Sequence, residues 1–167
     1  MKNIVLIGMP GAGKSTVGVL LAKNLLMDFT DTDLIIQRKT KKALCDIINE
    51  NSTEYFIRLE EEIILGEEFN NSVIATGGSA VYGETAMKKL KENSTVIYLK
   101  VALPELIQRL GDITTRGIAM DKSKGIPELF TERAPLYEKY ADKTIDCTEL
   151  SPEECVKRIY ALIKNEG

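Results

Sequence analysis

The sequence contains no histidine and no tryptophan, and its three cysteines are scattered. The absence of histidine excludes Ser-His and Cys-His nucleophilic catalysis, histidine-ligated zinc and a histidine general base. Cys45, Cys147 and Cys155 show no CxxC spacing, which is typical of reduced thiols rather than of a disulfide framework. Any proton transfer must therefore use carboxylates, lysines or solvent.

The sequence also lacks an excess of positive charge and a long apolar run. Its 22 Lys and Arg residues and 25 Asp and Glu residues give a net charge of −3 and a pI of about 5.2. Such a chain has no cationic field to attract nucleic acid, and no run approaches the roughly 18 residues of a membrane span. The first residues lead directly into a short apolar run, unlike a signal peptide. We expect a cytoplasmic monomer that acts on a small molecule, with no nucleic-acid or membrane partner.

The length and the apolar pattern predict one α/β domain. The chain has 167 residues, of which 44% are hydrophobic, enough for a single core. Short apolar runs rich in β-branched residues, each followed by a loop and a helical pattern, lie at 3–7, 72–75, 96–101 and 143–145, and a further short strand is expected at 29–30. Strands that alternate with helices indicate a parallel sheet covered on both faces.

Two segments do not fit this simple alternation. The region 31–69 has more helical pattern than one crossover requires, and Phe56, Leu59 and Ile63 mark a buried stripe that leaves Arg58 off it. The segment 111–126 is rich in Gly, Asp, Ser, Thr and Lys and has no clear period, so we expect a mobile loop there.

Residues 8–15 read GMPGAGKS and fit the P-loop pattern G-x-x-x-x-G-K-S/T at every fixed position, between a strand and a helix. Glycines allow backbone N–H groups to surround phosphates, and the helix N-terminus adds its positive dipole end. Lys14 supplies a charge for the β and γ phosphates, and the Ser15 hydroxyl is a ligand for magnesium. The motif predicts a site for a nucleotide and Mg²⁺, but it does not by itself separate kinases from other P-loop proteins.

Further candidate groups follow the predicted strands. Asp31 and Asp33 stand where the second strand ends, and they fit either a helix N-cap or a pair of carboxylates facing a metal and a substrate. Residues 76–79 read TGGS at the end of the next strand, where paired glycines let a ligand approach the backbone. Arg109 and Arg116 flank the 111–126 segment, and Arg133 lies just beyond it in an R-x-P-x-Y run.

Together, the P-loop, Asp-x-Asp, Gly-Gly, loop arginines and R-x-P-x-Y run make the chain resemble the shikimate kinases over nearly its whole length. The resemblance implies a three-layer P-loop NTPase fold with a five-stranded parallel sheet, a helical substrate-binding region at about 32–69 and a lid at about 111–126. It also implies transfer of the γ-phosphoryl group of ATP, with Mg²⁺, to a hydroxyl of shikimate in aromatic amino-acid biosynthesis.

On the nucleotide side, the resemblance implies that Asp31 holds magnesium through water, together with Ser15. Arg109 would stack on adenine, beside a loop at 145–152, and Arg116 would descend with the lid as a catalytic residue on the transferring phosphate. The remaining expected contacts to the nucleotide come from the P-loop: Gly11, Ala12, Gly13, Lys14, Ser15 and Thr16.

On the acceptor side, Asp33 would bind and deprotonate the accepting hydroxyl, which makes it catalytic together with Lys14. Arg58 and Arg133 would hold the shikimate carboxylate, while the backbone of Gly77 and Gly78 would approach the ring hydroxyls.

The chain departs from the family pattern on the substrate side. Thr53 and Ile57 stand where the family's G-E-x-x-F-R run has glycine and phenylalanine, and Ser79 replaces a third loop glycine. The lid run R-P-L-L becomes R-G-I-A, with Gly117 after Arg116. A kinase of another small hydroxy acid or polyol therefore stays open, as does a regulatory nucleotide-binding module. A GTPase is disfavoured, because the sequence has no N-K-x-D run.

Overall fold

The computed structural model describes residues 2–111, 118–120 and 124–164. Within these ranges, five strands form one parallel sheet in the order β2-β3-β1-β4-β5. The strands are β1 (Asn3–Ile7), β2 (Asp28–Asp31), β3 (Ser72–Ala75), β4 (Ser94–Lys100) and β5 (Lys143–Asp146). The α/β fold with a five-stranded parallel sheet, as predicted, is confirmed.

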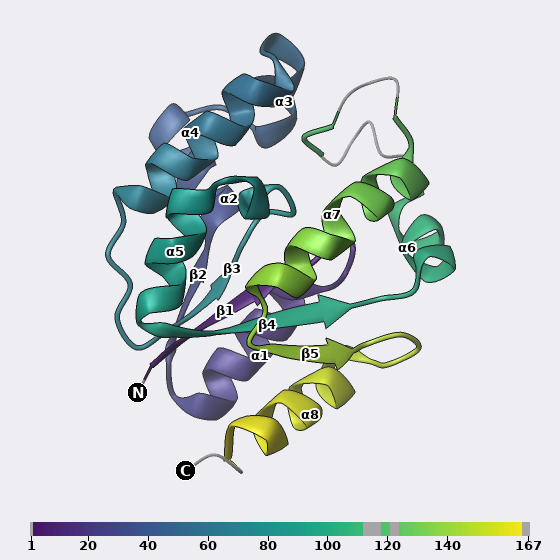
Figure 1. Cartoon of the computed structure of the whole chain (residues 1–167). Helices are drawn as coiled ribbons and strands as arrows, with labels where there is room; N and C mark the ends of the chain where they lie inside the picture. The colour runs from purple at the N-terminus through teal and green to yellow at the C-terminus, as the bar shows by residue number, and fades with distance from the viewer. Residues whose placement is uncertain (1, 112–117, 121–123, 165–167) are drawn as a thin grey trace.

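Helices cover both faces of the sheet (Figure 1). On one face, α1 (Lys14–Leu25) packs against α8 (Pro152–Lys164), and on the other lie α5 (Glu84–Glu92) and α7 (Ile126–Tyr140). The main core fills the space between these layers, and β1 is buried along its whole length because strands flank it on both sides. No helix in the described part of the chain is long and apolar enough to cross a membrane.

The strand order places a crevice beside β1. From β1 the chain moves past β3 to form β2, and after β3 it crosses back over β1 to form β4. In open α/β sheets, ligands bind outside the carboxyl ends of the strands where the winding direction reverses. The segments that follow β1, β2 and β3 therefore meet at one edge.

The region 31–69, where the sequence predicted more helix than one crossover requires, forms three helices that share a small core of their own. These helices are α2 (Thr32–Thr40), α3 (Leu44–Glu50) and α4 (Thr53–Leu65). A small cluster, separate from the main core, joins them through Ile35, Ile36, Ile47, Phe56, Ile63 and Ala119. The predicted stripe on α4 is confirmed at Phe56 and Ile63, whereas Leu59 is only partly buried. Glu60 is a buried member of that stripe that the sequence did not predict.

The segment expected to be a mobile loop is described only in part. Residues 112–117 and 121–123, which include Arg116 and Gly117, lie outside the described residues. Ala119 is buried in the small cluster, and α7 begins at Ile126, after α6 (Leu103–Leu110) and the predicted loop.

Candidate active site

The P-loop joins β1 to α1 through glycines with backbone angles that other residues rarely adopt. Gly11 has a φ of +81° and Gly13 a φ of +90°, and Gly13 is the N-cap of α1. A left-handed N-cap without a side chain leaves the first N–H groups of the helix open for a phosphate. The local sequence therefore forms an anion site at the start of α1.

Lys14 lies folded into this loop. Its Nζ donates hydrogen bonds to the carbonyl oxygens of Gly8 at 2.7 Å and Met9 at 2.8 Å. Burial lowers the pKa of Lys14 to about 8, against the opposing effect of Asp33. A phosphate dianion beside the ammonium would restore its preference for the charged form.

Asp31 connects the end of β2 to both neighbouring elements. Its Oδ1 accepts a hydrogen bond from the backbone N–H of Asp33 at 2.9 Å, so it is the N-cap of α2. Its Oδ2 accepts a hydrogen bond from Ser15 Oγ at 2.6 Å. The capping interpretation is therefore confirmed, and the metal-side interpretation stays a prediction, because the Asp31 oxygen that does not cap α2 contacts Ser15.

Ser15 and Asp31 fit a magnesium ion by the chemistry of their donor atoms. Both present hard oxygen atoms at the mouth of the P-loop, and Mg²⁺ is typically bound through one or two protein groups plus phosphates and water. Among the described residues, no group of three or more His, Cys, Asp or Glu side chains could form a complete protein cage. A shared site between protein and nucleotide is consistent with this donor set.

Gly77 and Gly78 are required by the side chains packed over them. A Cβ on Gly77 would lie 2.5 Å from Glu60 Oε2 and 2.8 Å from Asp33 Oδ1. A Cβ on Gly78 would lie 2.8 Å from Pro10 Cδ and 2.9 Å from an Nη1 atom of Arg133. The glycine pair thus lets two carboxylates and a guanidinium converge.

Arg133 and Tyr137 reach this loop from α7, four residues apart on one helix face. Arg133 is 1% exposed, donates from Nη2 to the carbonyl oxygen of Ala119, and stacks over the ring of Tyr82 at 5.3 Å. Tyr137 donates its hydroxyl to the carbonyl oxygen of Gly78 at 2.7 Å. In the R-x-P-x-Y run, Tyr137 therefore holds the glycine loop by a hydrogen bond, and Arg133 places its guanidinium beside that loop.

Glu60 brings a second carboxylate to the acceptor side. It is 1% exposed, and its Oε1 accepts a hydrogen bond from Ser79 Oγ at 2.6 Å. Burial raises the pKa of Glu60 to about 7, and burial with the charge of Asp31 raises that of Asp33 to about 6. Both groups therefore titrate close to neutral pH.

Many of these groups line one pocket of about 320 Å³ at the carboxyl edge of the sheet, and Asp31, Glu60 and Tyr137 lie outside its wall. Its wall combines the P-loop, the start of α2, the 76–79 loop and α7. The residues that line it include Gly11, Gly13, Lys14, Ser15, Thr16, Asp33, Gly77, Gly78, Ser79 and Arg133. A phosphate site and an acceptor site thus share one cavity.

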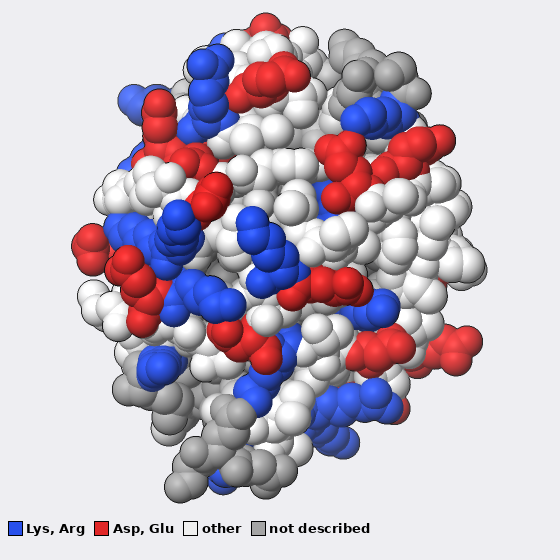
Figure 2. Space-filling view, viewed as in Figure 1, with Lys and Arg blue, Asp and Glu red and all other residues white. Residues whose placement is uncertain are grey.

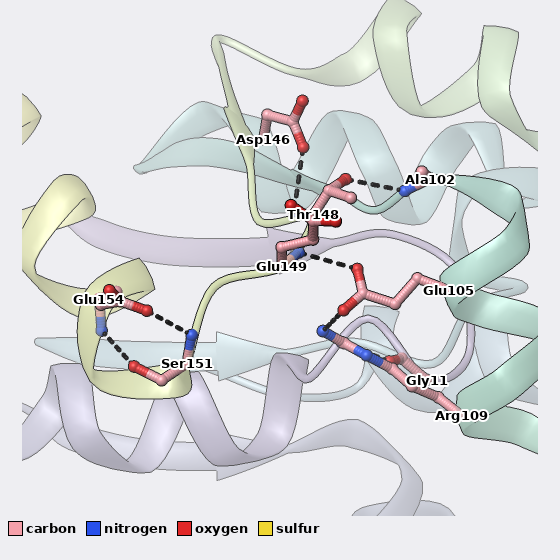
Figure 3. A network of polar contacts seen from close by, with 9 residues as sticks. All are labelled: Gly11, Ala102, Glu105, Arg109, Asp146, Thr148, Glu149, Ser151 and Glu154. Atoms are coloured by element: carbon pink, nitrogen blue, oxygen red, sulfur yellow. Dashed lines mark hydrogen bonds and ion pairs between the residues drawn. The ribbon is translucent and has the colours of Figure 1, made fainter.

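A network of polar contacts fixes the other end of the P-loop (Figure 3). Arg109 donates to the carbonyl oxygen of Gly11 and to Glu105 Oε1, each at 3.0 Å. The other carboxylate oxygen of Glu105 accepts the backbone N–H of Glu149 at 3.0 Å, where the chain turns with a φ of +59°. Glu105 therefore joins α6 and Arg109 to the loop between β5 and α8.

Comparison with known proteins identifies the family. The family model for shikimate kinase matches residues 10–164. The shikimate kinase of Thermodesulfovibrio yellowstonii is 40% identical over 162 residues, covering 95% of this chain and 93% of that protein. The chain belongs to the shikimate kinase family. The resemblance seen in the sequence is confirmed, and with it an enzyme that phosphorylates a hydroxyl group using ATP and Mg²⁺.

Solved structures agree with membership of the shikimate kinase family. The enzyme from Acinetobacter baumannii, solved in complex with shikimate, superimposes with a TM-score of 0.91 at 29% identity and covers 99% of this chain and 94% of that one. The enzyme from Aquifex aeolicus gives a TM-score of 0.79 at 31% identity, covering 98% and 97% of the two chains. The P-loop fold is therefore shared along the whole length.

Most of the described residues that the shikimate kinase resemblance named line the pocket, and four do not: Ala12, Asp31, Arg58 and Arg109. Arg58 is exposed on α4 and does not line the pocket, so its expected grip on a carboxylate has no support in this geometry. The reason is the helical period, because Phe56 and Glu60 face inward and a residue midway between them faces out. Arg109 and the buried Ala12 lie beside the pocket rather than in its wall.

Sequence reasoning missed Glu60, Ser79 as its partner, and Glu105. Glutamate is rarely buried unless it is paired, and Glu60 is the first of three consecutive glutamates. The sequence therefore did not indicate that Glu60 is buried. The stripe itself carried the available signal, since Glu60 is four residues beyond Phe56. Glu105 could have been noted as the residue four before Arg109.

The burial of Glu60 predicts a pH-dependent stability. Its folded-state pKa is raised to about 7, so the stability contributed by the neutral form is present at low pH and lost as the pH rises through 7. Glu60→Gln stays neutral and should raise the melting temperature by a few degrees at pH 8.5, at roughly 2–4 °C for each kcal/mol, with no gain at pH 5. Exposed Glu62→Gln is the matched control. Equal gains at both pH values would contradict the prediction.

The network around Glu105 predicts a selective effect on the nucleotide. Glu105→Ala removes one hydrogen-bond partner from Arg109 and one from the backbone of Glu149, so the KM for ATP should rise about tenfold, as for the loss of one charge-assisted hydrogen bond. The KM for the acceptor should stay within about twofold, because the 76–79 loop is untouched. Steady-state kinetics with Glu153→Ala as the exposed control tests this. Parallel rises in both KM values would count against it.

Proposed function

We propose that this chain transfers the γ-phosphoryl group of ATP to a hydroxyl of shikimate, a step of aromatic amino-acid biosynthesis. The observation that carries the proposal is the single pocket that brings Lys14, Asp33 and buried Arg133 together. The similarity to a shikimate kinase solved with shikimate, at a TM-score of 0.91, supports the acceptor.

The P-loop binds the phosphates of ATP. The backbone N–H groups of residues 11–16 surround them at the start of α1, and Lys14 exchanges its contacts with the Gly8 and Met9 carbonyls for phosphate oxygens. Arg109, held by Gly11 and Glu105, stacks on the adenine. These contacts orient the nucleotide and stabilise the negative charge of the transferring group.

Ser15 and, through water, Asp31 hold the magnesium ion. When bound, this ion would offset the negative charge of the phosphates. The Ser15–Asp31 hydrogen bond sets the orientation of both oxygen donors before the ion binds.

Asp33 and Arg133 act on the acceptor. Asp33 orients the attacking hydroxyl and takes its proton at a carboxylate oxygen, while Arg133 holds the carboxylate of shikimate with its planar fork. The backbone of Gly77 and Gly78 lies against the ring hydroxyls. Because Arg58 is exposed, we assign it no part in this binding.

The chain works as one domain, with the helical region at 32–69 on the acceptor side and a lid at 111–126. The resemblance assigns Arg116 to the transferring phosphate, and Arg116 lies outside the described residues. Ile118 and Ala119 line the pocket at the edge of this segment, which supports a lid position there.

We further propose a cytoplasmic monomer without nucleic-acid partners. The net charge is −3, and on the face shown in Figure 2 Lys and Arg are interspersed with Asp and Glu. Nucleic-acid binding needs a continuous basic surface, which this face does not present.

A kinase of another small hydroxy acid or of a polyol is the second candidate. One observation favours it, because Arg133 is the only arginine among the described residues that line the pocket, and Glu60 and Asp33 add negative charge beside it. A less anionic acceptor would meet less repulsion there.

Shikimate-dependent release of ADP tests the proposal directly. Arg133→Lys keeps a charge but loses the fork, and it should raise the KM for shikimate roughly ten- to a hundredfold with little change for ATP. Arg58→Ala is the matched control and should leave both values within about twofold. No shikimate-dependent ADP release, with turnover of another hydroxy acid or polyol, would overturn the substrate assignment.

The titrating groups predict a bell-shaped pH profile. The kcat/KM for shikimate should fall below pH 6, where Asp33, with a pKa of about 6, becomes protonated and cannot accept the hydroxyl proton. The kcat/KM for ATP should fall above pH 8, where Lys14, with a pKa of about 8, loses its charge. Initial rates from pH 5 to 9 measure both limbs, and a flat profile would contradict these roles.

A further inference from the structure

One oxygen atom behind the glycine loop has no hydrogen-bond partner. In the part of the chain that the structure describes, Glu60 Oε2 is the one buried side-chain oxygen or nitrogen atom without a partner. The other oxygen of the same carboxylate accepts the hydrogen bond from Ser79 Oγ at 2.6 Å. An unpaired buried acceptor destabilises the fold, so such a group calls for an explanation.

The unpartnered oxygen lies close to the acceptor side of the pocket, next to Gly77, although Glu60 is not among the residues that line it. Glu60 Oε2 and Asp33 Oδ1 lie 2.5 Å and 2.8 Å from the same point, the place that a Cβ on Gly77 would occupy. Gly77 and Asp33 both line the pocket. Because the N–H of Gly77 already donates to Thr32 Oγ1 at 3.1 Å, the loop cannot supply the missing donor from this group.

The charged groups around Glu60 come from several packed elements. Asp33 reaches it from α2, Lys14 from α1 and Arg133 from α7, while Ser79 meets it from the loop after β3. The described surroundings thus contain one further carboxylate and two cations, and the Ser79 hydroxyl is the neutral donor among them. Ser79 therefore decides which oxygen of Glu60 is held and which one is left free.

We propose that Ser79 is a positioning residue for the acceptor: it clamps one oxygen of Glu60, so that the other accepts a hydrogen bond from an acceptor hydroxyl, directly or through one water. This inference rests on the proposed function. If the Ser79 hydrogen bond served only the fold, a neutral side chain in place of Glu60 would serve it better. A buried carboxylate with a free oxygen destabilises the fold.

The backbone at position 79 does not require this side chain. Ser79 has a φ of −89° and a ψ of −5°, which any residue adopts, and it precedes η1 (Ala80–Tyr82) without capping it through its side chain. Ser79→Ala consequently removes the clamp and leaves the loop geometry in place.

The experiment compares Ser79→Ala with the unmodified full-length chain. The KM for shikimate should rise about tenfold, as for a lost hydrogen bond to a charged group, while the KM for ATP stays within about twofold. The hydrogen bond from Ser79 favours the charged form of Glu60, whose pKa lies above that of Asp33. Its loss should therefore make kcat/KM for shikimate begin to fall at a higher pH than the Asp33 titration near pH 6 alone would cause. Carbon-13 titration of the Glu60 carboxyl, assigned with Glu60→Gln, should show the same upward shift without substrate.

Two further variants make the result specific. Ser72→Ala removes a buried hydroxyl from β3, outside the pocket, and should change neither KM nor the acid limb. Ser79→Gly removes the same clamp and should reproduce the effect of Ser79→Ala, which separates the effect of the hydroxyl from that of the Cβ that alanine retains.

The outcomes distinguish the inference from the proposed function. An unmodified chain without shikimate-dependent ADP release would overturn the function, and the inference with it. A normal unmodified chain with an unaffected Ser79→Ala variant would overturn the inference alone, as would equal rises in KM for both substrates.

Discussion

The burial of charge at the carboxyl edge of the sheet is the constraint on which the rest of the site depends. Lys14, Arg133 and Glu60 are all nearly inaccessible to water. Buried charges are tolerated only where polar groups surround them. Here main-chain carbonyl oxygens of the P-loop accept hydrogen bonds from Lys14, and that of Ala119 accepts one from Arg133. The glycines at 77 and 78 then provide the space in which acids and guanidinium meet.

This arrangement divides the site into two halves that meet at Lys14. The nucleotide half is tied to the sheet through Glu105, whose carboxylate holds Arg109 and the loop after β5. The acceptor half depends on α4 and α7, whose inward faces carry Glu60 and Arg133. Because different helices support the two halves, binding of one substrate can be altered with little effect on the other.

The sequence predicted the features that depend on local pattern. The P-loop and the strand periodicity located β1, β3 and the nucleotide half, because their signals are contained in a few consecutive residues. The sequence did not reveal Glu60, whose burial depends on Ser79 and on the packing of α4. Arg58 shows the same limit, since a motif places a residue in order along the chain whereas the helical period decides which way it faces.

The small cluster beneath the acceptor half carries a consequence for the wall of the pocket. Ile36, Ile47 and Phe56 pack with one another rather than within the main core under the sheet. Substitutions in such a satellite reshape the wall around the acceptor while the main core keeps its packing. Because Phe56 belongs to this satellite and also lines the pocket, changes in these three short helices would alter the pocket wall without disturbing the packing of the P-loop in the main core.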